Sequence, residues 1–131
     1  MAGTFSTAMN NKLLDHILKT TSFAVPTNIY VALYTVAPTA SGGGTEVSGN
    51  GYARKVHNSW DAGSSGATEN TGALTFDPAS GGNWGTVLAF GIFDAITGGN
   101  FLAWGDLTAS KDVNDGDTAE FAAGALDITL T

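Results

Sequence analysis

A short acidic run is the clearest candidate in this chain for a metal site. Asp112–Asp117 reads DVNDGD, and it spaces oxygen ligands around a glycine as a calcium-binding EF-hand loop does. Gly116 falls one position early in that register, and the twelfth position holds Ala123 where the loop requires a bidentate glutamate. An acidic hairpin turn is the better interpretation. We therefore predict no metal site, and no motif indicates a cofactor.

Residue types for acid–base or nucleophilic catalysis are present, but their spacing does not favour catalysis. A hydrolase needs a nucleophile beside a base that a third group orients. His16 and His57 are the only histidines in a chain without cysteine, and Gly63–Gly66 (GSSG) does not match the G-x-S-x-G elbow. Most acidic residues flank turns, and no spacing marks a carboxylate pair. We predict that the chain is not an enzyme, and a small glycan-active enzyme stays an alternative hypothesis.

The segment between residues 37 and 52 is rich in glycine and irregular. Gly42–Gly44 and Gly49-Asn50-Gly51 could suggest a phosphate cradle, but such a cradle needs a following helix, usually with a lysine. A strand-like Tyr52-Ala53-Arg54 follows instead. The pattern therefore predicts a long surface loop, and long loops in compact domains are often functional.

Aromatic side chains offer a different chemistry, because they could stack on sugars. Trp60 and Trp84 each stand at a strand boundary, so we expect them to be the more exposed tryptophans. Aromatic residues in half-buried strands more often belong to the core. Core packing is the preferred interpretation, and sugar binding stays an alternative.

Charge and composition restrict the partners. The net charge is −7, and the five cationic residues form no patch beyond Arg54-Lys55. Binding a phosphate backbone needs clustered lysines or arginines, so we expect no nucleic acid partner. No segment is apolar for about 18 residues and the N-terminus has no signal pattern, so we expect no membrane partner and a soluble protein made in the cytoplasm.

The first structural element that the pattern predicts is a helix at about residues 7–20. Ser6 or Thr7 can act as its N-cap. Because the helix is short, it needs another element to cover its apolar stripe. The stripe consists of apolar residues at helical spacing: Met9, Leu13, Leu14, Ile17 and Leu18.

The remainder of the chain predicts strands. Residues 29–35 are apolar on both faces, which indicates a central strand, and shorter strands are expected at 52–60 and 72–76. Residues 84–95 and 101–107 predict a hairpin. The last strand should direct Leu126, Ile128 and Leu130 inward. We predict a single domain over 1–131 that is mainly β, with the N-terminal amphipathic helix followed by an antiparallel β-sandwich of jelly-roll or Ig-like type.

Several stretches resemble known proteins and occur in the same order: LLDHIL, IYVALYTVAPTASGGGTEVSGNGYAR, GIFDAITGGN, FLAWGDLT and GDTAEFAAGALDITL. Together they cover nearly the whole chain. They resemble a family of small tailed-phage virion structural proteins, whose members are often labelled phage tail fibre or hypothetical phage structural proteins.

This resemblance implies a non-enzymatic component of the virion, and it leaves two placements open. The first is a capsid decoration (cement) protein that stabilises the outer shell. The alternative is a tail fibre or tail tip module that binds a host receptor or glycan. The chain has neither an internal repeat nor a heptad run of the kind found in a shaft, which favours the capsid. The expected partners are the major capsid protein or other virion proteins, and a homo-oligomer is expected on the particle.

Five residues are the candidates for contacts with these partners. Phe5 and Met9 could dock on a partner, with Met1–Phe5 acting as an arm that reaches an adjacent subunit. Glu46 and Asn50 lie in the long loop. Arg54 could pair with an acid across an interface.

Overall fold

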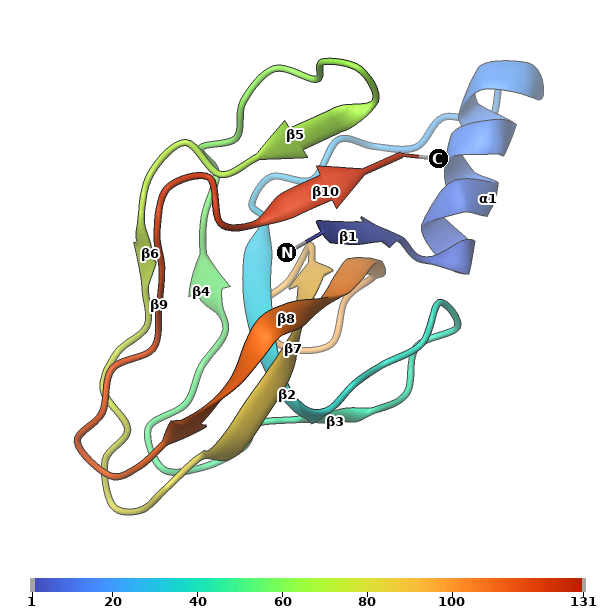
Figure 1. Ribbon diagram of the computed structural model, residues 1–131. Helices are drawn as coiled ribbons and strands as arrows, with labels where there is room; N and C mark the ends of the chain where they lie inside the picture. Colours follow the sequence, from blue (N-terminus) through green and yellow to red (C-terminus); the bar gives the residue numbers. More distant parts are fainter. Residues whose placement is uncertain (1, 131) are drawn as a thin grey trace.

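The computed structural model describes residues 2–130 and shows a mainly β protein with one short helix near its N-terminus (Figure 1). Its elements are β1 (Ala2–Phe5), α1 (Thr7–Leu18), β2 (Tyr30–Val36), β3 (Thr45–Glu46), β4 (Lys55–Val56), β5 (Ala67–Glu69), β6 (Leu74–Thr75), β7 (Gly85–Phe93), β8 (Phe101–Val113), β9 (Glu120–Phe121) and β10 (Asp127–Thr129).

Eight strands form one large sheet in the order β3-β2-β7-β8-β1-β10-β5, with β4 also paired to β2. The second sheet pairs β6 with β9. The pairing is antiparallel except between β1 and β10, which run parallel. The predicted fold class, a mainly β sandwich with an N-terminal helix, is confirmed. The parallel pair makes the large sheet a mixed one.

The core lies between the large sheet and the β6–β9 layer. Phe121 of β9 packs against Phe90 of β7 and against Phe76, with ring centroids 6.4 Å apart in each pair. The opposite face of β2 and β7 carries a smaller buried cluster that includes Tyr34 and Phe93. Strand β2 is therefore buried on both faces, as its doubly apolar sequence predicts.

The β7–β8 hairpin confirms the prediction for residues 84–107. Its turn is closed by Asp94, whose carboxylate accepts hydrogen bonds from the backbone N–H and the side-chain amide of Asn100, each at 2.7 Å. The other expected strands are shorter than their patterns suggested, because β4 and β6 each span two residues.

The N-terminal segment is part of the sheet and not an arm, which corrects the prediction for Met1–Phe5. Ala2–Phe5 forms β1 between β8 and β10, while Met1 lies outside the described residues. Gly3 lies opposite Gly105 of β8. A Cβ on Gly3 would be 2.7 Å from the carbonyl oxygen of Trp104, so this pairing requires the absence of a side chain.

Helix α1 begins as predicted but is covered less than predicted. The Ser6 hydroxyl caps it by accepting a hydrogen bond from Met9 N–H at 3.1 Å, and it also donates to the carbonyl of Phe101 in β8 at 2.6 Å. Met9 is the buried residue of the helix, and Leu13 is partly buried. The remaining apolar residues of the expected stripe are exposed: Leu14 by 56%, Ile17 by 69% and Leu18 by 75%.

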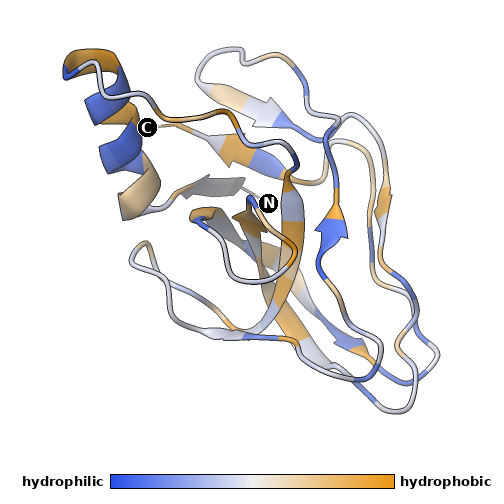
Figure 2. Ribbon diagram, turned by 180° about the vertical axis from the view of Figure 1, so that it is seen from behind, coloured by the Kyte–Doolittle hydropathy of each residue, from blue (hydrophilic) through white to orange (hydrophobic). Residues whose placement is uncertain are grey.

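The C-terminal strand follows the predicted alternation only in part. Leu126 and Ile128 are buried, whereas Leu130 lies beyond the end of β10 and is 52% exposed, so the prediction for Leu130 was wrong. Strand β10 lies between β1 and β5 at one side of the large sheet (Figures 1 and 2).

Candidate functional site

A cluster of polar side chains surrounds Arg54. Its guanidinium binds the Glu46 carboxylate through two hydrogen bonds, Nε to Oε2 at 2.8 Å and Nη2 to Oε1 at 2.9 Å. Nη1 donates to the carbonyls of Ala95 and Gly98, at 2.9 and 2.8 Å. The Phe93 ring lies under the guanidinium, with 3.6 Å between Cζ and the ring centroid. Arg54 therefore ties β3 to the turn that joins β7 and β8.

Tyr52 extends this cluster into the protein. Its hydroxyl donates to Glu46 Oε2 at 2.7 Å and accepts the backbone N–H of Leu33 at 3.0 Å. Burial and the adjacent Glu46 raise the pKa of Tyr52, although the Leu33 hydrogen bond acts in the opposite direction. Burial alone would lower the pKa of Arg54, but the hydrogen bonds and charge of Glu46 outweigh it and raise that pKa. Arg54, Glu46 and Tyr52 therefore bind one another within the chain.

Asn50 lies apart from the Arg54 cluster. Its side-chain amide donates to the carbonyl of Asn83 at 2.9 Å, and its own carbonyl accepts the indole N–H of Trp84 at 2.9 Å. Trp84 is buried, so the expectation that it is one of the exposed tryptophans was wrong. Its side chain instead fastens the long loop to the start of β7.

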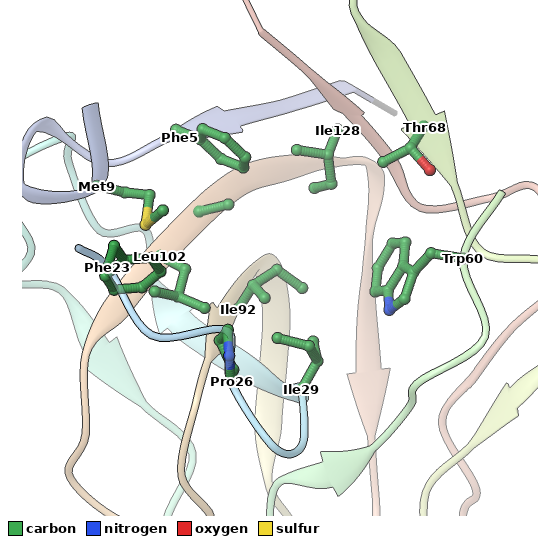
Figure 3. A pocket seen from close by; sticks show the side chains of 11 residues that line it. Phe5, Met9, Phe23, Pro26, Ile29, Trp60, Thr68, Ile92, Leu102 and Ile128 are labelled. Carbon is green, nitrogen blue, oxygen red and sulfur yellow. The ribbon is translucent and has the colours of Figure 1, made fainter. Parts of the chain in front are cut away.

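An apolar cavity of about 220 Å³ lies where α1, β1 and the segment after the helix meet the large sheet (Figure 3). Phe5 and Met9 both line it, with Trp60 on its far side. Trp60 is partly buried, and its indole N–H donates to the carbonyl of His57 at 2.9 Å. Thr68 supplies the one side-chain oxygen among the lining residues, so the cavity suits apolar groups.

A second hollow, of about 390 Å³, is acidic and lies at the β5 edge of the large sheet. Asp61, Glu69 and Asp127 line it, and Glu69 stands directly opposite Asp127 across the β5–β10 pair. A hydrogen bond with Asp127, together with the charges of Asp127 and Asp61, raises the pKa of Glu69. Within residues 2–130, no three or more of the histidine, aspartate and glutamate side chains are placed to hold a metal ion.

The structure thus brings the five sequence-predicted residues together in two pairs and leaves one alone. Phe5 and Met9 share the apolar cavity, Glu46 and Arg54 form an ion pair within the chain, and Asn50 joins neither. The acid that pairs with Arg54 comes from its own chain.

A comparison with protein families matches residues 4–129 to the family described as Podophage GP4 fiber I protein gp80. This chain belongs to that family. The match confirms the resemblance to tailed-phage virion structural proteins, so this gp80-family chain is a phage virion structural protein. Among curated proteins, no sequence matches it significantly. In the part of the chain that the structure describes, no helix has the length and apolar character needed to cross a membrane.

Sequence reasoning missed two features of this gp80-family chain. The first is Asn70, a buried asparagine whose amide contacts three backbone groups: the carbonyls of Gly72 and Ala122 and the N–H of Leu126. A lone asparagine between short strands carries no pattern that separates it from an ordinary turn residue. The second is the uncovered face of α1, because the periodicity that marks an apolar stripe does not tell what covers it.

Proposed function

We propose that this chain is a non-enzymatic fibre component of a short-tailed phage virion, and that it is held there by other virion proteins. The observation that carries the proposal is the family match, which spans residues 4–129 and whose description names a fibre protein. The sequence-based preference for capsid decoration rested on the lack of an internal repeat and of a heptad run, which is a weaker ground than a match over nearly the whole chain.

The polar geometry supports a structural role. The donors and acceptors of Arg54, Glu46 and Tyr52 are engaged with one another and with nearby backbone groups. A catalytic site requires groups that are free to reach a substrate. The cluster instead holds the turn between β7 and β8 in place through the carbonyls of Ala95 and Gly98. Such internal bracing suits a component that must keep its shape on the particle.

The proposal is tested by the copy number of the chain in purified virions, measured by quantitative mass spectrometry against the major capsid protein. A fibre component is expected at a few to a few tens of copies per particle. A ratio near one copy to one or to three capsid subunits would overturn the fibre proposal and favour capsid decoration.

A further inference from the structure

The outer face of α1 is apolar and uncovered. Leu14, Ile17 and Leu18 are each more than half exposed. The ribbon coloured by hydropathy shows hydrophobic residues in the last turn of the helix, at the end that projects from the domain (Figure 2). The opposite side of the helix faces the protein, because Met9 is buried and the Lys12 ammonium lies 5.6 Å from the centre of the Phe23 ring.

The exposed residues form a regular row. Thr7, Asn10, Leu14 and Ile17 recur at alternating spacings of three and four residues, which is the spacing of a helix–helix seam. Leu18 lies beside them. At about 100° per residue, all five fall within an arc of about 100°, and none of them is charged. The charged residues of the helix, Lys12 and Asp15, lie outside this arc, as does Lys19 at its C-cap.

This charge pattern favours a second copy of the same chain as the partner. When identical helices pack in parallel around a symmetry axis, each seam residue meets its own counterpart, so a charge in the seam would face a like charge. The row carries none. Residues 7–19 hold two lysines against one aspartate, a formal charge of +1, so the rest of the chain carries −8 of the total −7. This face therefore adds no charge repulsion between two copies, whereas the rest of the chain is strongly acidic.

The helix is also held in place for such packing. Ser6 N–H donates to the carbonyl of Leu102 at 2.8 Å, and Thr7 N–H donates to the carbonyl of Ala40 at 2.9 Å, so the first turn is fixed to two separate segments. An isolated helix of this length is marginal in water, and a partner on its outer face would supply the packing that its last turns lack.

We propose that the chain self-associates through this row on α1 (Thr7, Asn10, Leu14, Ile17 and Leu18), each copy presenting the same face to the next. The proposal holds whether the chain sits in a fibre or elsewhere on the virion, because it uses only the exposure and charge of the helix.

Sedimentation velocity of the full chain at micromolar to submillimolar concentration tests the proposal. We expect species larger than the 13.3 kDa monomer, and at least tenfold weaker association for Ile17→Gln and Leu18→Gln. Ile96→Gln is the matched control, because Ile96 is about half exposed but lies in the β7–β8 turn. A chain that stays monomeric, or that is weakened equally by Ile96→Gln, would overturn the proposal and leave the face to a different virion protein.

Disulfide trapping gives a second, independent readout, since the natural chain has no cysteine. Leu14→Cys lies in the middle of the row and should cross-link between copies under mild oxidation. Lys12→Cys, on the other side of the helix, should not. Equal rates of cross-linking in the two variants would refute the proposed face even if the chain associates.

Discussion

Replacing Arg54 by methionine should destabilise the domain more than any change to a surface ion pair. The Arg54 side chain is only 9% exposed, and it joins the Glu46 carboxylate, two carbonyls and the Phe93 ring. Removing one partner of a buried ion pair costs about 3–5 kcal/mol, because the other charge is left unpaired. Glu46 is 25% exposed and can recover some hydration, so we expect the lower end of that range, about 3 kcal/mol.

Urea unfolding followed by tryptophan fluorescence measures this loss. Lys55→Met is the matched control: its ammonium lies 3.3 Å from Asp77 in a pair that is 38% and 81% exposed, and such pairs contribute about 0–1 kcal/mol. A double-mutant cycle with Glu46→Gln should give a coupling energy of about 1–3 kcal/mol. A loss for Arg54→Met no larger than for Lys55→Met, or a coupling energy near zero, would refute the reasoning.

Three further changes test other parts of the structure. Gly105→Ala should cost about 1–3 kcal/mol in unfolding free energy, because its Cβ would lie 2.8 Å from Gly3 Cα and from the Phe90 ring, whereas Gly63→Ala, with open space around it, should change little. Asn70→Ala should lower the free energy of unfolding by about 3 kcal/mol, because it removes three hydrogen bonds of 2.7 to 3.0 Å and leaves the N–H of Leu126 without its acceptor. An equal loss for Asn58→Ala, at an exposed asparagine, would contradict this prediction. Glu69→Gln should stabilise the domain at pH 7: the raised pKa of Glu69 means that its protonated form favours folding and that this contribution is lost as pH rises through the folded-state pKa. The gain in melting temperature should disappear below about pH 4, where Glu69 is protonated in the unfolded state too, and a variant less stable than the natural chain at pH 7 would show the reasoning to be wrong.

The elements with strong periodicity could be predicted from the sequence. The helix with its Ser6 cap, the doubly buried β2 and the β7–β8 hairpin all follow from local patterns that dominate their own packing. Strand β1 could not be foreseen in the same way. Its four residues, AGTF, are too few and too small to show an alternation, and its pairing depends on Gly105, which is far away in the sequence.

The candidate contacts were predicted less well, for a physical reason. Arg54 was predicted to meet an acid across an interface, because an arginine in a weakly charged chain needs an anionic partner. In the structure that partner is Glu46 of β3, in the same chain. Whether an arginine pairs with an acid of its own chain or of a partner chain depends on tertiary geometry, which local sequence does not give. The exposure of Leu14, Ile17 and Leu18 could not be predicted for the same reason. The sequence pattern of an apolar stripe is the same whether the stripe packs on its own chain or on another molecule.

The most direct test of the proposed function is the position of the chain on the particle. Purified virions can be labelled with gold-conjugated antibodies against this chain and imaged by electron microscopy. A fibre component predicts gold confined to the fibres at the tail end of the particle. Gold distributed evenly over the capsid shell would contradict the account.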